Sequence, residues 1–411
     1  MSTATTAAAE IPRARPQAAV AVGAGVVALA CTLALGIAVD GRLAALLVVG
    51  GLAGLALHHA LFGFAASTRQ FLVERRGAGI RAQLLMLAAA SIVFAPLLAG
   101  GSAFGQGLSG ALAPVGVSVA IGAFLFGVGM QLGGGCASGT LTGAGAGSLR
   151  MSVTLGAFIA GSVLATAHMP WWLGQPALAA LSIPQTLGWP AGLAVQLAAI
   201  GLLALGAIAL ERRRHGDHEP LVWGAGTDWR AHLQHGGWPL AWGALALALL
   251  NLATLLIAGH PWSVTWGFTL WGAALADALG FAIADWTFWQ WPRPARALEA
   301  GVAQDTVSVM NVGLILGALL GAALAGRFAT RRRLGAGAVA SAVIGGLLLG
   351  YGARLAFGCN IGALFSGIAS GSVHGWLWLL AVLPGAALGA RLRPLFGLDN
   401  GAACVAAGTN P

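Results

Sequence analysis

The chain has 411 residues, of which 58% are hydrophobic and only 8% are charged, against about 25% charged in ordinary soluble domains. Apolar runs long enough to cross a bilayer recur from end to end, so the composition excludes a soluble protein and predicts an all-α polytopic membrane protein. The net charge is +9, but the arginines cluster in short connections between apolar runs, as membrane orientation requires, so we expect no nucleic-acid partner.

The first half of the chain alternates apolar spans with short connections. A polar N-terminal tail occupies residues 1–17, and the first membrane half is predicted to extend over 18–210. Its predicted spans are 18–39, 43–57, 82–98, 115–130, 151–167 and 190–210. Segment 60–67 is apolar but too short to cross, and it leads into a predicted basic loop at 68–81.

A polar stretch at 211–237 is predicted to be a cytoplasmic linker between two halves. The second membrane half extends over 238–397 and is followed by a C-terminal tail at 398–411. Its predicted spans are 238–258, 309–325, 335–351 and 372–390, with one or two half-helices expected in 263–291. Together these segments predict about nine or ten transmembrane helices plus short half-helices. Asp277 and Asp285 lie in the half-helix segment, where a proton relay and placement at the membrane interface are both open.

The arginine clusters give an orientation. We place the arginine clusters at 69–81, 212–214 and 327–333 on the cytoplasmic side. About ten crossings, an even number, then leave both termini in the cytoplasm. We therefore expect a multi-pass protein of the bacterial inner (plasma) membrane, surrounded by membrane lipids.

Two stretches, 132–148 and 355–372, indicate an internal duplication. Aligned from Ile121 and Ile344, they share a ladder of glycines around one cysteine: Gly122/Gly345, Gly127/Gly350, Gly129/Gly352, Gly135/Gly358, Cys136/Cys359 and Gly139/Gly362. The parity of the spans puts Cys136 on a loop reached from the cytoplasm and Cys359 on a loop reached from the other side. The halves are therefore predicted to be inverted repeats, a common plan of transporters.

The cysteine loops predict an anion site. Gly135 and Gly358 allow the backbone to turn sharply and to approach a ligand closely. The residues after each cysteine are expected to begin a short helix, whose N-terminus attracts an anion. A thiol is a weak donor and a soft, polarisable contact, which suits a sulfur-containing anion. Further candidate donors along the pathway are Ser138, Thr140, Asn360 and Ser366.

Other interpretations remain open at this point. A buried cysteine in a membrane helix is commonly a small apolar filler, although matched cysteines in a duplicated loop argue for a function. Arg354 stands where the first repeat has Gln131, and it is either functional or reaches to the membrane interface. The two loop cysteines would also suit a redox or sulfur-transfer couple if their Cα atoms came within about 7 Å. The four cysteines lack CxxC spacing, so neither a metal nor another cofactor is expected.

At these residues the chain resembles the YeeE/YedE family of sulfur-compound (thiosulfate) membrane transporters. The similar stretches are GGGCASGTLTGAG at 133–145, GYGARLAFGCNIGALFSGIASGSVHGWLW at 350–378, PWSVTWGFTLWG at 261–272 and MNVGLILG at 310–317. The resemblance covers most of the chain from about residue 43 to 397.

The resemblance implies an hourglass-like helical protein, not an enzyme, in which short helices meet at a central constriction. Thiosulfate, or a related sulfur or selenium compound, would move inward through contacts with Cys359 and Cys136. The resemblance also implies a TusA-like sulfurtransferase as a cytoplasmic partner. Family members often carry a further cysteine before the first basic loop, and HHALFGFAAS at 58–67 has none, so two thiols are expected here and not three.

Overall fold

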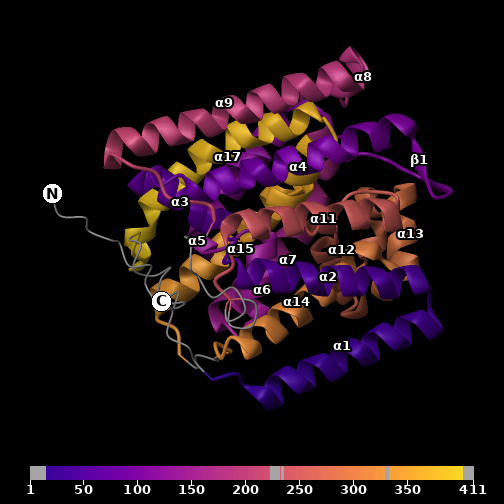
Figure 1. The fold of residues 1–411 in the computed structure, drawn as a ribbon. Coiled ribbons are helices and arrows are strands. Elements are labelled where there is room, and N and C mark those ends of the chain that lie inside the picture. Colours follow the sequence, from indigo (N-terminus) through magenta and orange to yellow (C-terminus); the bar gives the residue numbers. More distant parts are fainter. Residues whose placement is uncertain (1–14, 223–231, 233–235, 329–332, 401–411) are drawn as a thin grey trace.

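The computed structural model describes residues 15–222, 232, 236–328 and 333–400. Its long helices run side by side along one axis (Figure 1). We call one end of the bundle the linker end. There the Gly237 N–H donates to the His59 carbonyl, and Arg81 forms an ion pair with Glu211. The opposite end, the far end, joins Ser109 to Gly259 and Val117 to Pro176 through backbone hydrogen bonds of 2.8 and 3.1 Å.

The helices follow the apolar runs of the sequence. In the first half they are α1 (Ala18–Ala38), α2 (Gly41–His59), α3 (Phe64–Glu74), α4 (Ala78–Gly100), α5 (Val117–Gly133), α6 (Ala137–Gly145), α7 (Leu149–Leu173), α8 (Ile183–Leu187) and α9 (Trp189–His215). In the second half they are α11 (Leu240–Ala258), α12 (Thr265–Ala278), α13 (Pro292–Ala300), α14 (Thr306–Leu324), α15 (Ala336–Leu355), α16 (Gly367–Ala369) and α17 (Val373–Leu392).

Short elements complete the chain. The π-helix η4 (Asn360–Ser366) comes directly before α16, and 3-10 turns form η1 (Ile283–Asp285), η2 (Thr287–Gln290), η3 (Val302–Gln304) and η5 (Arg393–Phe396). At the far end, β1 (Ser102–Ala103) pairs with β2 (Gln106–Gly107), and β3 (Val115–Gly116) pairs with β4 (Ala177–Leu178).

The predicted class, an all-α polytopic membrane protein, is confirmed. Within the described residues, ten helical segments are long and apolar enough to cross a bilayer. The expected short helices are also present: α3 has 11 residues, α6 has nine and α12 has 14. At 1.5 Å per residue these cannot cross a hydrocarbon core of about 30 Å, so they end inside the bundle.

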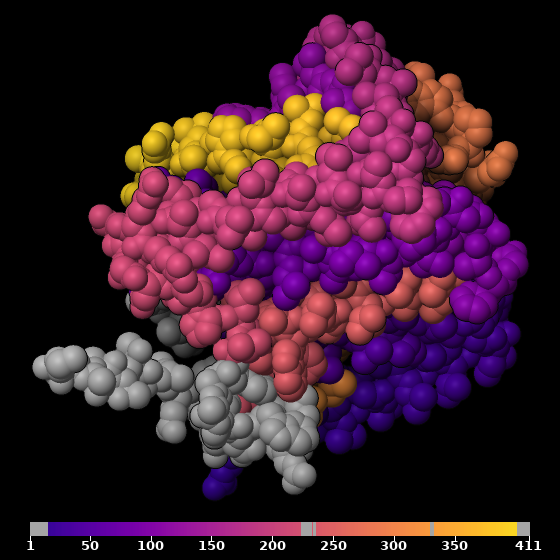
Figure 2. Space-filling model, turned by 45° about the horizontal axis from the view of Figure 1, so that its top comes forward, coloured from indigo at the N-terminus to yellow at the C-terminus, as the bar shows by residue number. Residues whose placement is uncertain are grey.

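The outer helices differ from the inner ones in burial. Only 6% of the apolar window of α1 and 17% of that of α9 are buried inside the protein, so these two helices present apolar side chains outward. Figure 2 shows α9 lying on the surface between α17 and α4, with α11 beyond α4. The inner helices α5, α7, α15 and α17 surround the two cysteine loops. They form the pairs α5–α15, α5–α17 and α7–α15.

Close packing explains the glycine ladder. A Cβ atom added at Gly122 would meet the carbonyl of Gly352, and one added at Gly352 would meet the carbonyl of Gly122. Gly129 and Gly345 face each other's helices in the same way. The repeated glycines therefore let α5 and α15 approach at backbone distance, as small residues do in membrane bundles.

The element order of the halves corresponds. Helices α2 to α7 run long, short, long, long, short, long, and α11, α12, α14, α15, η4–α16 and α17 repeat that order. The contacts of α5 with α17 and of α7 with α15 are those expected of a duplication. The inverted orientation of the halves stays a prediction.

The predicted basic loop at 68–81 is wrong, and the structure describes only part of the predicted linker at 211–237. Residues 68–81 are not a basic loop, because α3 continues to Glu74 and buries Arg69, whose exposed fraction is 5%. In the predicted linker at 211–237, α9 extends to His215, and residues 223–231 and 233–235 lie outside the described residues. The same holds for Arg331 and Arg332 of the predicted inner cluster and for most of both tails.

Candidate substrate pathway

Cys136 caps the N-terminus of α6 from inside the bundle. Its Sγ accepts the Gly139 N–H at 3.5 Å and lies 3.3 Å from Ser138 Oγ. The side chain is 1% exposed, and the thiol is free. The predicted short helix after this cysteine is present, and α6 leads out to the linker end through Ser148, the cap of α7.

Cys359 occupies the matching position at η4. Its Sγ accepts the Ile361 N–H at 3.4 Å, its side chain is fully buried, and its thiol is also free. The half-helix formed by η4 and α16 ends at Ser370, whose hydroxyl accepts the Ala111 N–H at the far end. The two half-helices thus begin at a cysteine in the interior and leave toward opposite ends.

Glycines give both loops their shape. Gly134 ends α5 with φ +88, and Gly358 has φ +155, conformations that L side chains rarely adopt. A Cβ atom at Gly135 would lie 3.2 Å from the Thr140 nitrogen, and one at Gly358 would lie 2.6 Å from the Ala363 nitrogen. The glycine before each cysteine therefore lets the loop fold back onto the first turn of its own half-helix.

The predicted polar residues divide into two groups. Ser138 contacts the Cys136 thiol, and Asn360 is 2% exposed with an Oδ1 atom that has no hydrogen-bond partner. Thr140 Oγ1 instead donates to the Cys136 carbonyl at 2.8 Å, and Ser366 Oγ donates to the Trp262 carbonyl at 2.6 Å. Thr140 and Ser366 therefore hold the loops in position, whereas the role of Ser138 and Asn360 toward a ligand stays a prediction.

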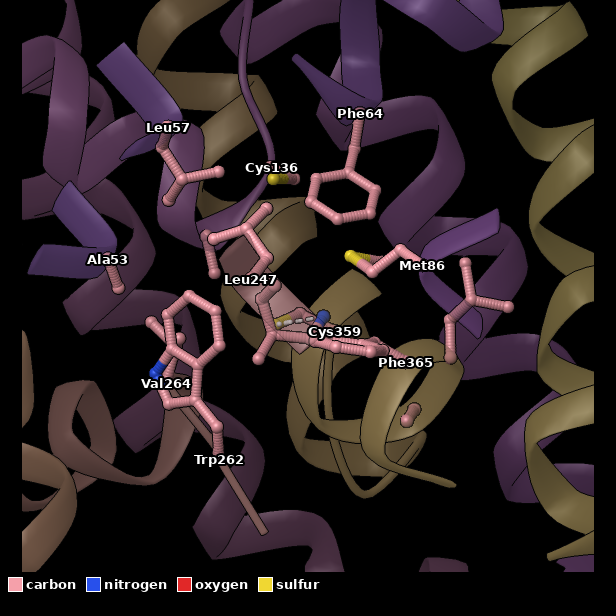
Figure 3. Packing of buried hydrophobic residues seen from close by; sticks show 14 of the residues in the cluster. Ala53, Leu57, Phe64, Met86, Cys136, Leu247, Trp262, Val264, Cys359 and Phe365 are labelled. Carbon is pink, nitrogen blue, oxygen red and sulfur yellow. Dashed lines mark hydrogen bonds between the residues drawn. The ribbon is translucent and has the colours of Figure 1, made fainter. Parts of the chain in front are cut away.

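Both cysteines belong to one buried apolar cluster (Figure 3). The side chains of Phe64, Met86 and Leu247 lie around and between the two thiols in this view. Met86 is fully buried, and its thioether adds a second kind of soft sulfur contact. The surroundings of the thiols therefore favour a polarisable ligand over a strongly hydrated one.

Arg354 lies at a cavity of about 670 Å³ near the far end. Its guanidinium carbon is 5.6 Å from the centre of the Trp266 ring and 5.7 Å from that of Phe288, and its Nε is buried without a hydrogen-bond partner. The cavity is also lined by His260, Ser263, Arg293, Arg296 and Asp305. Asp305 caps α14 through the Ser308 N–H at 2.7 Å and accepts from Trp266 Nε1 at 3.1 Å. The cavity is therefore basic overall, and a functional role of Arg354 stays a prediction.

The cavity approaches the second cysteine loop. Ser263 lies against Gly362, since a Cβ atom added at that glycine would be 3.3 Å from Ser263 Oγ. Gly362 belongs to the first turn of η4, three positions after Cys359. Arg354 and Cys359 thus belong to one region, and Cys136 belongs to the opposite side of the same interior cluster.

Sequence reasoning missed several residues of this region. Asn251 of α11 accepts the Trp262 N–H at 2.8 Å and donates to Ser366 Oγ at 3.2 Å, which ties α11 to η4. A lone amide in the apolar run 240–258 was a usable signal. Met86 had no such signal, and Arg293 and Arg296 stand in a segment whose depth the sequence did not reveal. Asp277 and Asp285 are both exposed, which places neither of them in the interior.

The broken helices, the buried thiols and the basic cavity define a polytopic helical membrane protein of the transporter class. The sequence pattern of the family described as "Sulphur transport" matches residues 59–388, and the chain belongs to this family. The predicted kinship with sulfur-compound transporters is thereby confirmed.

Three relatives of this chain are named as transporters. The chain is 32% identical to the "Probable transporter YedE" of Escherichia coli over 154 residues, 37% of each chain. The same-named protein of Salmonella typhimurium is 32% identical over 161 residues, 39% of each chain. The "Thiosulfate transporter TsuA" of Spirochaeta thermophila is 29% identical over 272 residues, which is 62% of this chain and 72% of the relative. The match to the two YedE proteins thus covers well under half of their length.

Proposed function

We propose that the chain moves thiosulfate, or a related sulfur-containing anion, inward across the bacterial inner membrane past Cys359 and then Cys136. The observation that carries this proposal is the pair of free thiols at the starts of two half-helices that leave toward opposite ends. A helix N-terminus attracts an anion, and a thiol hydrogen bonds weakly to a sulfur atom, so an anion is held at each loop without being trapped.

The proposed orientation in the membrane rests on the distribution of arginine. The linker end carries Arg75, Arg76, Arg391 and the run 212–214, and the positive-inside rule supports a cytoplasmic location for this end. Gln17 also lies at this end, where it bonds Phe328 at 2.8 Å. The far end then faces outward, and the basic cavity at Arg354 is the outer opening.

Electrostatics at the outer opening favour a divalent anion. Arg293, Arg296 and Arg354 line the cavity, and its carboxylate, Asp305, is engaged by Trp266 and Ser308. A basic cleft with apolar walls concentrates anions and raises their rate of association. Beyond it, the apolar cluster around Cys359 and Met86 suits the soft terminal sulfur of thiosulfate better than the oxygens of sulfate.

On the cytoplasmic side, a TusA-like sulfurtransferase is a suitable acceptor. Thiosulfate carries a transferable sulfur atom, so a carrier with a reactive thiol at the linker end would consume the transported anion. The exposed arginines of α9, 212–214, give such a partner a charged surface to dock on.

The experiment is uptake of radiolabelled thiosulfate into proteoliposomes, with sulfate, sulfite and a selenium oxyanion as competitors. We expect saturable thiosulfate uptake that excess unlabelled thiosulfate abolishes and that sulfate weakens far less. Equal competition by sulfate would contradict a sulfur-selective pathway. Electron exchange with an added dithiol in the absence of uptake would favour the redox alternative instead.

A further inference from the structure

Arg150 is a buried cation that the pathway above does not use. It stands in the first turn of α7, and its exposed fraction is 2%. Its Nη2 donates to the Leu132 carbonyl at 2.8 Å and lies 3.4 Å from Ser341 Oγ. Its Nε and Nη1 are buried and have no hydrogen-bond partner. One nitrogen of this guanidinium is therefore satisfied by the protein, and the other two are not.

No carboxylate in the described part of the chain pairs with Arg150. The ion pairs of the linker end join Arg76 and Arg81 to acidic residues of 211–219 and do not include it. The nearby charge that acts on Arg150 is another cation, Arg69 of α3, whose exposed fraction is 5%. Burying an uncompensated charge costs several kcal/mol, so such an arginine is normally retained to meet an anion.

The unsatisfied side of Arg150 faces the first cysteine loop. A Cβ atom added at Gly134 would lie 3.1 Å from Nη1 and 3.4 Å from the guanidinium carbon. Gly134 is two positions before Cys136, and its φ of +88 turns the chain from α5 into the loop. The guanidinium thus lies beside the Cys136 loop, on the route by which α6 leads to the linker end.

The second half has a different group at the matching place. GSLR at 147–150 and GSVH at 371–374 each follow a half-helix and open the next long helix. His374 is 1% exposed, and its Nδ1 bonds Ser372 Oγ at 2.7 Å. An imidazole that is buried and hydrogen-bonded to its neighbour carries no permanent charge, whereas an arginine is always charged. The two matching positions, 150 and 374, therefore differ in their attraction for an anion.

We propose that Arg150 forms an inner binding site for the transported sulfur oxyanion, to which Nε and Nη1 donate hydrogen bonds after the anion passes Cys136. This inference rests on the proposed function and adds a residue that binds the substrate on the cytoplasmic side. An always-charged group there favours occupancy of the region beyond Cys136 by a divalent anion.

The test is equilibrium binding of radiolabelled thiosulfate to the purified protein in detergent. Arg150→Gln is expected to weaken binding about tenfold or more, as loss of a charge-assisted contact does, and Arg150→Lys to recover part of the affinity. Two controls should bind like the wild type: Ser341→Ala, which removes a contact of Arg150 but keeps its charge, and Arg391→Gln, an exposed arginine of the linker end. Unchanged binding by a folded Arg150→Gln protein overturns the proposal.

A second measurement needs no substitution at Arg150. Hydrogen exchange of the wild-type backbone should slow within 131–151 when thiosulfate is added. Protection of 354–366 without protection of 131–151 overturns the inner site but leaves the proposed transport function standing. Absence of any thiosulfate binding by the wild type counts against both. Protection of 131–151 by phosphatidylglycerol but not by thiosulfate assigns the site to a lipid headgroup and likewise overturns the proposal.

Discussion

Gly122 and Gly352 face each other across the contact of α5 and α15, and each one leaves no room for a Cβ atom beside the other's carbonyl. These residues belong to the ladder that the two halves share, so the duplicated sequence coincides with a helix contact at backbone distance. The helices that deliver both cysteine loops are therefore fixed relative to each other at the level of the backbone.

Substitution of Gly352 by valine should destabilise the protein. The added side chain must separate α5 from α15, and overpacking of this kind costs about 1–3 kcal/mol. The matched control is Gly201→Val in α9, where an added Cβ atom has nothing within 4 Å. Thermal unfolding in detergent should show a lower midpoint for Gly352→Val alone. Equal midpoints for the two variants would mean that the α5–α15 contact is not tight.

Loss of Asn251 should loosen the second cysteine loop. Asn251→Leu leaves the Trp262 N–H without its acceptor, at about 1–3 kcal/mol for an unsatisfied buried group, and removes the amide that donates to Ser366 Oγ. Thr254→Val is the control in the same helix, because the Thr254 hydroxyl bonds only Leu250 of its own turn. Thiosulfate uptake and thermal stability should both fall for Asn251→Leu and remain near wild type for Thr254→Val. The opposite order would show that Asn251 does not position η4.

Arg354→Gln should raise the thiosulfate concentration that gives half-maximal uptake by about tenfold, because one charge-assisted contact is worth roughly 1.5–3 kcal/mol. Arg354→Lys should be less affected, since it keeps the charge but loses the planar stacking on Trp266. When thiosulfate is supplied at the far end, the maximal rate of uptake should change less than the concentration that gives half-maximal uptake. A purely structural role would instead lower protein abundance and leave that concentration unaltered.

The ion pair of Glu211 and Arg81 should stabilise the linker end. The pair is separated by 2.9 Å, and the Glu211 side chain is fully buried. Glu211→Gln removes the negative charge that balances Arg81, which costs up to about 3–5 kcal/mol for a buried pair. Asp217→Asn is the control: Asp217 pairs with Arg76 at 3.3 Å, but it is 74% exposed and should contribute less than about 1 kcal/mol. Chemical or thermal unfolding of both variants distinguishes these expectations.

Much of this architecture could be predicted from the sequence, since apolar span length and arginine placement are local signals. The matched positions of Cys136 and Cys359 were visible because a duplication conserves spacing within one chain. The structure adds the reason for the glycines, which lies in contacts between residues more than two hundred positions apart, as between Gly122 and Gly352.

The roles of single polar groups were less predictable. Thr140 and Ser366 have the right chemistry for ligand donors, but a buried hydroxyl bonds the nearest carbonyl, and which carbonyl is nearest depends on the fold. Arg150 looked like an ordinary basic residue at a helix start. Only its burial next to Gly134, without a carboxylate, distinguishes it from the exposed arginines of α9.

The central claim is that the two loop thiols carry the sulfur anion through the interior. Its most direct test is the rate of thiosulfate uptake by Cys136→Ala, Cys359→Ala and the double variant, with Cys31→Ala in the outer helix α1 as the control. We expect each loop variant to lose most of its uptake, the double variant to show none above empty vesicles, and Cys31→Ala to match the wild type. Wild-type uptake by a double variant of normal abundance would contradict the account.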